Sequence, residues 1–201
     1  MLAFVWSGWT TIWPTQLLAL IWVAWLISWA VGAFWSGRTE KHVRTWDSRA
    51  YRIPILAGAV LLTPWTQQVL GERPVWHVGN GGTYLLAGLT LAGTLFTWWA
   101  RIHLGRFWSN AITRKEGHRV IDTGPYGLVR HPIYTGLIAA MLATGVAVGT
   151  ISAMLGAVLI AIGLWQKARM EEGFLAQELG ADAYKSYARR VPMLVPLLPQ
   201  S

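Results

Sequence analysis

Four long apolar runs, separated by short polar segments, limit what this chain can fold into. They lie at Thr11–Trp35, Ile53–Leu70, Thr83–Ala100 and Pro132–Trp165. A membrane-spanning helix needs roughly 20 mainly apolar residues, so each of the first three runs has the length of one span. The fourth run is too long for one span, and the pair Gly149-Thr150 lies near its middle, where a turn would divide it in two. The runs therefore predict an all-α, polytopic membrane protein of five transmembrane helices, the last two forming a helical hairpin.

The basic residues between the runs support this division. Lysine and arginine number none before the first run, five in Ser36–Arg52, one after the second run, six after the third, none at the hairpin turn and five in the tail. Cytoplasmic loops of membrane proteins carry an excess of these residues. The alternation, which four or six spans would break, predicts an N-terminus outside the cell and a C-terminus in the cytoplasm. It also explains the net charge of +8 without a nucleic-acid partner.

Composition excludes several kinds of site. The chain has no cysteine, so disulfides, thiolate metal sites and cysteine nucleophiles are excluded. Its five histidines show no ligand spacing, so no metal is expected. No basic residue precedes the first apolar run, and that run is too long for the core of a signal peptide, so we expect no cleavable signal peptide.

Two further patterns have simple interpretations. Trp22, Trp25 and Trp29 share one helix face, which indicates a stripe that packs against lipid or another helix, or alternatively a wall of a substrate site. The glycine-rich segment from Val78 to Gly82 follows no predicted strand, so we expect a plain turn there and not a phosphate-binding loop.

Residues that could carry chemistry gather in the third basic loop, which ends at His131. Gly124-Pro125 predicts a turn, and His131-Pro132 predicts a helix start with proline at the first helical position. The N-terminus of that helix favours an anion such as a carboxylate or a phosphate. Arg130 could bind the same anion bidentately. Alternatively, Arg130 and His131 anchor the chain at the lipid headgroups.

The tail supplies the acidic residues. Glu171 and Glu172 are about 100° apart around a helix, so we expect one to face the bundle and the other to pair with Arg169 or solvent. Two carboxylates at the membrane boundary are costly unless they bind a cation. A solvated helix face is the alternative interpretation of the pair. Tyr184 and Tyr187, spaced i and i+3, are expected to be interfacial anchors.

The order of these elements resembles a known enzyme family. Gly124 to Gly136 reads Gly-Pro-Tyr-x-x-Val-Arg-His-Pro-x-Tyr-x-Gly, then come an apolar hairpin, Glu171-Glu172, and Gly-x-x-x-Tyr-x-x-Tyr ending at Tyr187. This pattern is similar to the isoprenylcysteine carboxyl methyltransferase family and, more distantly, to phospholipid N-methyltransferases. The similarity covers about half of the chain. Gly127 departs from the family's usual basic or bulky residue.

The resemblance implies S-adenosylmethionine as the cofactor, bound in a cytoplasmic pocket that opens sideways to the bilayer. The cofactor's ammonium would bind Glu171 or Glu172, and its carboxylate would bind Arg130, His131 and the helix start. The residues expected to bind the cofactor are His118, Val120, Gly124, Pro125, Tyr126, Val129, Arg130, His131, Pro132, Tyr134, Glu171 and Glu172. The residues expected on the acceptor side, where catalysis occurs, are Arg106, Asn110 and Arg169, together with Trp108.

These inferences predict a multi-pass integral membrane methyltransferase whose active site lies on the cytoplasmic side. Residues 1–100 would form a three-helix membrane anchor and residues 101–201 the catalytic region, within one structural unit. The acceptor would be a lipophilic or lipidated molecule that enters from the bilayer. An isoprenylcysteine-like carboxylate is favoured, and a phospholipid amine or a small thiol is the alternative. Other hypotheses are a membrane transporter or scaffold, and a sterol-type reductase that binds a nicotinamide cofactor.

Overall fold

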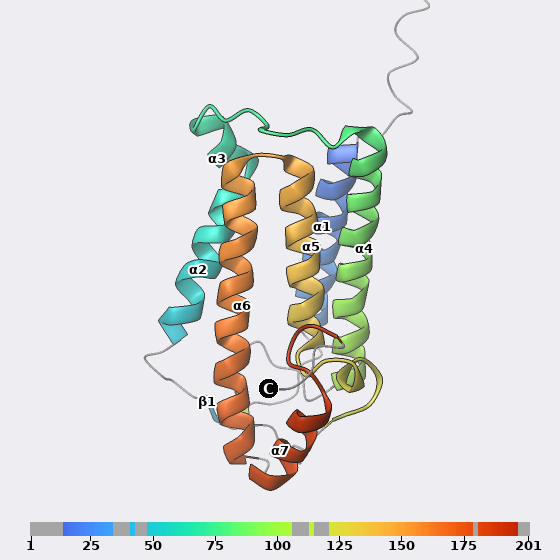
Figure 1. Cartoon of the computed structure of the whole chain (residues 1–201), viewed down its shortest axis with the longest axis vertical. Helices are drawn as coiled ribbons and strands as arrows, with labels where there is room; N and C mark the ends of the chain where they lie inside the picture. The colour runs from blue at the N-terminus through green and yellow to red at the C-terminus, as the bar shows by residue number, and fades with distance from the viewer. Residues whose placement is uncertain are drawn as a thin grey trace, which may run out of the picture.

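The chain folds into a bundle of long helices with roughly parallel axes (Figure 1). The structure is a computed structural model and describes residues 14–33, 41–42, 48–105, 113–114, 121–178 and 181–196. Its helices are α1 (Pro14–Ala33), α2 (Ser48–Leu61), α3 (Pro64–Val69), α4 (Gly79–Leu104), the 3₁₀ helix η2 (Gly124–Gly127), α5 (Pro132–Val148), α6 (Ile151–Glu178) and α7 (Ala181–Arg190). Two short strands, β1 (Lys41–His42) and β2 (Thr113–Arg114), pair antiparallel. The predicted all-α class is confirmed.

The helical hairpin forms where the sequence predicts it. Helix α5 ends at Val148, and Gly149 has a left-handed backbone with φ of 77°. Left-handed residues that end helices are usually glycine, because a side chain is strained there. Helix α6 begins two residues later and continues past Lys167 to Glu178, as expected. The hairpin therefore carries the acidic residues of the tail back to the start of α5.

The second apolar run is divided, contrary to the continuous helix expected over Ile53–Leu70. Helix α2 ends at Leu61, and Thr63 is extended, with φ of −72° and ψ of 142°. The residue before a proline is disfavoured in the helical region, and Pro64 follows Thr63. The Thr63 hydroxyl then caps α3 by accepting a hydrogen bond from the Thr66 N–H at 3.2 Å. The helix break therefore follows from the local Thr63-Pro64 pair.

The glycine-rich segment before the third run is also different from the expectation. Residues 79–82 form the first turn of α4 and not a separate turn. The Thr83 hydroxyl donates a hydrogen bond to the Gly79 carbonyl at 2.9 Å within this turn. Helix α4 is therefore 26 residues long, which exceeds the apolar run that predicted it.

The hairpin lies at the centre of the bundle, with α4 packed on α5, α1 on α4 and α2 on α6 (Figure 1). Glycines allow close backbone approach at two of these contacts. A Cβ atom at Gly93 on α4 would lie 2.6 Å from the Gly136 carbonyl oxygen of α5. One at Gly156 on α6 would lie 2.6 Å from the Gly58 carbonyl oxygen of α2. Small residues at such contacts are typical of membrane helix pairs. The helices of the predicted anchor region thus flank both sides of the hairpin.

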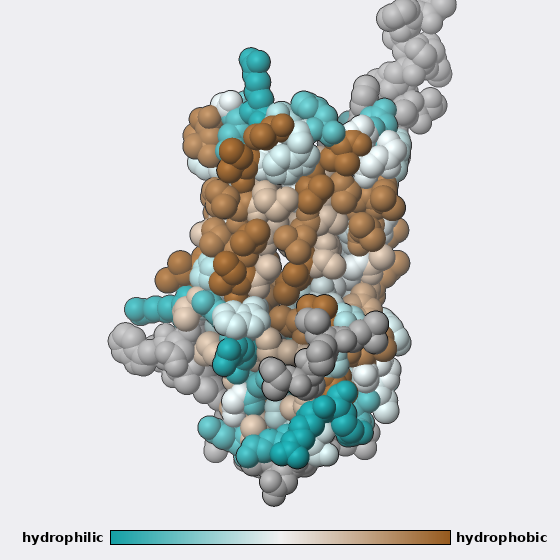
Figure 2. Space-filling model, viewed as in Figure 1, coloured by the Kyte–Doolittle hydropathy of each residue, from teal (hydrophilic) through white to brown (hydrophobic). Residues whose placement is uncertain are grey.

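Hydrophobic side chains cover the middle of the visible face, and hydrophilic ones gather at its two ends (Figure 2). Among the described residues, two helices are long and apolar enough to cross a membrane: Gly79–Leu104 and Ile151–Gln177. Two shorter apolar helices cover Gln16–Gly32 and Pro132–Val148. The number of five spans and their orientation remain predictions.

Candidate active site

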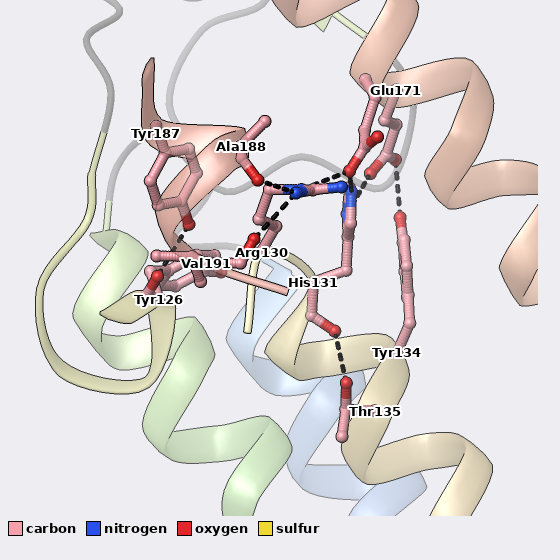
Figure 3. Close-up of polar contacts among 10 residues, drawn as sticks. Tyr126, Arg130, His131, Tyr134, Thr135, Glu171, Tyr187, Ala188 and Val191 are labelled. Carbon is pink, nitrogen blue, oxygen red and sulfur yellow. Dashed lines mark hydrogen bonds and ion pairs between the residues drawn. The ribbon is translucent and has the colours of Figure 1, made fainter. Parts of the chain in front are cut away.

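The predicted site residues meet at the end of the bundle where α5 begins and α6 ends. Helix α7 and the residues that follow it lie against this end (Figure 1). Five side chains form what we term the carboxylate cluster: Arg130, His131, Tyr134, Glu171 and Glu172 (Figure 3). The convergence of the third loop with the tail, predicted from the sequence, is confirmed for these residues.

Local backbone preferences place Arg130 and His131 at this end. Gly124 has φ of 57°, and the turn predicted at Gly124-Pro125 is the 3₁₀ helix η2. His131 is the N-cap of α5, and Pro132 is its first helical residue, as predicted. Proline suits this position because the first N–H groups of a helix have no partner within it. The start of α5 therefore fixes the positions of the Arg130 and His131 side chains.

Arg130 is held by three short contacts. Its Nε donates to Glu172 Oε1 at 2.6 Å, and its Nη1 donates to the carbonyl oxygens of Ala188 at 2.7 Å and Val191 at 2.8 Å. A guanidinium presents its donors in a rigid fork, so contacts on two sides fix its orientation. Arg130 thus joins the end of α7 to the carboxylate cluster (Figure 3).

His131 lies between the two glutamates. Its Nδ1 is 3.6 Å from Glu171 Oε2, and its Nε2 is 3.4 Å from Glu172 Oε1. The side chain is 6% exposed, and its ring stacks on Tyr134 with centroids 5.5 Å apart. Burial lowers the pKa of His131, but the adjacent carboxylates outweigh burial and raise it above 6.5. Although Nε2 is within ion-pair distance of Glu172, it is buried and has no hydrogen-bond partner.

Both glutamates belong to the cluster, which corrects the expectation that one would pair with Arg169 or solvent. Glu171 Oε1 accepts a hydrogen bond from the Tyr134 hydroxyl at 2.6 Å, while Glu172 binds Arg130. The angular offset between adjacent helical residues puts one carboxylate on each side of the His131 ring. Arg169 is exposed instead, with its guanidinium 5.3 Å from the Trp165 ring.

A segment missed by sequence reasoning, residues 191–194, closes the start of α5. We call it the C-terminal strap. The N–H groups of Arg130 and His131 donate to the carbonyls of Pro192 at 2.8 Å and Met193 at 3.1 Å, and the Thr135 hydroxyl donates to Leu194 O at 2.7 Å. These two N–H groups are therefore bound by the strap, and the anion site expected at the first turn of α5 remains a prediction. Proline at 192 and 196 could have indicated that the chain is non-helical there.

Tyrosines of α7 pack inside this end and are not the interfacial anchors that were expected. Tyr184 and Tyr187 are 5% and 4% exposed, and the Tyr187 hydroxyl donates to the Tyr126 carbonyl at 2.7 Å. Burial raises the pKa of Tyr126 and Tyr187, so both phenols stay neutral. Val129, three residues after Tyr126, is also fully buried. This part of the site is therefore a buried, partly apolar wall.

Several predicted residues lie outside the described part of the chain. They are Arg106, Trp108, Asn110, His118 and Val120. Their roles remain predictions. Within the described ranges, no group of three or more His, Asp or Glu side chains could hold a metal ion.

Together, the helical bundle and its apolar surface indicate an integral membrane protein, with a charged cluster at one end of the bundle. Residues 86–177, from α4 to the end of the carboxylate cluster, match the Isoprenylcysteine carboxyl methyltransferase (ICMT) family. This match confirms the family resemblance that the sequence motif indicated.

Curated relatives agree with this assignment. The chain is 33% identical over 132 residues to protein-S-isoprenylcysteine O-methyltransferase B of Arabidopsis thaliana, covering 64% of each chain. It is 31% identical over 106 residues to the Schizosaccharomyces pombe protein-S-isoprenylcysteine O-methyltransferase, covering 50% of this chain and 43% of that one. It is 30% identical over 156 residues to methanethiol S-methyltransferase 2 of Bradyrhizobium diazoefficiens, covering 72% and 58%. The chain thus spans less than two thirds of the length of each of these relatives.

Proposed function

We propose that the protein is a membrane-embedded methyltransferase that uses S-adenosylmethionine and methylates a lipophilic acceptor entering from the bilayer. The observation that carries this proposal is the carboxylate cluster, where Arg130 lies 2.6 Å from Glu172 and His131 lies within 3.6 Å of both glutamates. The names of the relatives support the reaction class.

The charges of the cluster fit the methionine part of the cofactor. That part carries an ammonium and a carboxylate, and the cluster offers both carboxylates and cations at one place. Glu171 and Glu172 would accept hydrogen bonds from the ammonium, and Arg130 and His131 would receive the carboxylate. The buried His131 Nε2, which has no hydrogen-bond partner, is a donor or acceptor suited to a polar ligand. Tyr126 and Val129, which are expected beside the adenosine, are both buried in this end of the bundle.

The chain's own contribution to catalysis would be orientation and exclusion of water. When bound, S-adenosylmethionine supplies a methyl group already activated on a sulfonium. Arg130, fixed by three contacts, would hold the site in one arrangement. The buried tyrosines would keep water from the reacting atoms, and neutralisation of an anionic acceptor is favoured in such a dry site.

An isoprenylcysteine-like carboxylate is the favoured acceptor, because two of the relatives are named for that substrate. A small thiol is the second candidate, because the methanethiol methyltransferase aligns with 72% of this chain, a larger share than the others. Both acceptors react as anions and need no proton acceptor after transfer. A phospholipid amine would need one.

Isothermal titration of detergent-purified protein with S-adenosylhomocysteine and with NADPH tests the proposal. We expect S-adenosylhomocysteine to bind, and Glu172→Gln and Arg130→Ala each to weaken binding by more than about tenfold, because each removes a charged contact. Arg189→Ala, at an exposed arginine of α7, is the matched control and should bind as wild type does. Circular dichroism verifies that each variant is folded. Binding of NADPH alone would favour a reductase, and binding of neither would favour a scaffold or transporter.

A further inference from the structure

We propose that Lys167 is a positioning residue that joins helix α2 to the carboxylate cluster and orients Glu171. The proposed function enters only through the identity of the ligand that Glu171 would bind. Lys167 lies on α6, with its side chain 11% exposed. Neither Lys167 nor α2 was expected to take part in the site.

The lysine ammonium lies among groups from three helices. Nζ is 3.9 Å from Glu171 Oε1, one helical turn further along α6. It is 5.3 Å from the centre of the Tyr134 ring on α5 and 5.8 Å from the Tyr51 ring on α2. A cation within about 6 Å of an aromatic ring is attracted by the ring's electron density. The carboxylate and the two rings therefore offset part of the cost of removing an ammonium from water.

Close packing of α2 on α6 explains why Tyr51 is available to the lysine. A Cβ atom at Gly163 would lie 2.8 Å from the Tyr51 carbonyl oxygen, so only glycine permits this approach. Gly163 precedes Lys167 by four residues, which puts both on the same face of α6. Tyr51 itself is 7% exposed. The contact therefore extends the wall of the site from the hairpin to α2.

The arrangement fixes the orientation of Glu171. Its Oε1 faces both the Lys167 ammonium and the Tyr134 hydroxyl, which donates at 2.6 Å. Its Oε2 faces His131 Nδ1 at 3.6 Å. Without the ammonium, the neutral phenol would be the one partner of Oε1 among the described residues, and the carboxylate could rotate out of the cluster. Loss of Lys167 should therefore weaken the binding of any cationic ligand to Glu171, although Lys167 itself need not contact that ligand.

Titration of S-adenosylhomocysteine into lysine variants tests this role. Lys167→Met keeps the length of the side chain without its charge, and we expect binding to weaken about tenfold, the size typical of coupled polar neighbours. Lys167→Arg keeps the cation and should restore binding. The double variant Lys167→Met with Glu171→Gln should bind no more weakly than Glu171→Gln alone, because the lysine acts through that carboxylate. Lys185→Met, at an exposed lysine of α7, is the matched control.

The two proposals fail in different ways. If wild-type protein binds S-adenosylhomocysteine and Lys167→Met binds equally well, or if the lysine and Glu171 effects add, the positioning role is overturned while the proposed function stands. If wild type does not bind, the proposed function fails.

Thermal unfolding of the ligand-free protein then still tests the contact between Lys167 and Tyr51. The losses in unfolding temperature for Lys167→Met and Tyr51→Leu should be less than additive, whereas Tyr51→Phe, which keeps the ring, should resemble wild type. Additive losses would overturn the proposal.

Discussion

His131 is the residue of the carboxylate cluster whose charge should change near neutral pH. Arg130, Glu171, Glu172 and Tyr134 surround it. Burial opposes its protonation, but the two carboxylates outweigh burial and raise its pKa above the ordinary 6.5. A group whose pKa is raised on folding stabilises the folded state fully below its unfolded pKa, and this stabilisation is lost as the pH rises through the folded pKa. The protein should therefore lose stability as the pH rises above 6.5.

This prediction can be checked with thermal unfolding of detergent-purified protein across about pH 6 to 9, the range in which a histidine with raised pKa titrates. The wild-type unfolding temperature should fall as the pH increases. His131→Gln, which cannot be protonated, should show a flatter profile and be closest to wild type at the alkaline end. A parallel decline in both proteins would contradict the role of His131. His103→Gln is a suitable control, because His103 is exposed and contacts Thr123 outside the cluster.

At the scale of the helical hairpin, stability depends on the turn at Gly149. Its φ of 77° is unfavourable for any residue with a side chain, and a Cβ atom there would lie 2.5 Å from the Trp76 carbonyl oxygen. Gly149→Ala should therefore lower the free energy of unfolding by about 1–3 kcal/mol, the usual cost of a non-glycine residue in such a conformation. Unfolding by denaturant, followed by circular dichroism, measures this difference. Gly81→Ala is the matched control, since nothing lies within 4 Å of its position, and a stability equal to the control would contradict the prediction.

The C-terminal strap should control ligand binding as an element. Its carbonyl oxygens accept hydrogen bonds from the backbone N–H groups of Arg130 and His131. The Val191 carbonyl also accepts a hydrogen bond from the Arg130 guanidinium. Truncation after Arg190 removes these acceptors, so Arg130 should lose its fixed orientation. We expect S-adenosylhomocysteine to bind at least about tenfold more weakly, because a charged hydrogen-bond network is broken. Truncation after Pro196 keeps the strap and should bind normally. Equal affinities of the two truncated proteins would show that the strap has no such role.

Helix ends that are determined by neighbouring residues could be predicted from the sequence. Pro132 begins α5 and Gly149 ends it, because each residue restricts or permits the backbone at its own position. The same local reasoning explains the break at Pro64, although the apolar run there indicated a continuous helix. The motif around Arg130 and the glutamates then predicted which helix ends would meet, and the structure confirms it.

Contacts made by backbone atoms distant in sequence could not be predicted. Nothing in the residue types of the strap indicates that its carbonyls accept from Arg130. The contribution of Tyr51 depends on how closely α2 approaches Gly163, which is a property of tertiary packing. The same limit applies to the glutamate pair, since both carboxylates face His131 only because α6 has a particular rotation.

For the whole molecule, the placement of charge sets the orientation that we predict in the membrane. The pairing of β1 with β2 brings the first and third basic loops together. Helix α7 lies at the same end of the bundle as β1, and the start of α4 lies at the other (Figure 1). An excess of basic residues favours the cytoplasmic side, so the carboxylate cluster should face the cytoplasm, where a soluble cofactor is available.

Labelling of single cysteines tests this orientation directly, because the chain contains no cysteine of its own. Ser186→Cys lies on the exposed side of α7, and Asn80→Cys lies in the exposed first turn of α4. A membrane-impermeant maleimide added to intact cells should label Asn80→Cys and leave Ser186→Cys unmodified. In inverted vesicles the pattern should reverse, since the five predicted spans put these two positions on opposite sides. Labelling of both cysteines from the same side would contradict the three spans predicted between these positions, and a reversed pattern would put the cluster outside the cytoplasm.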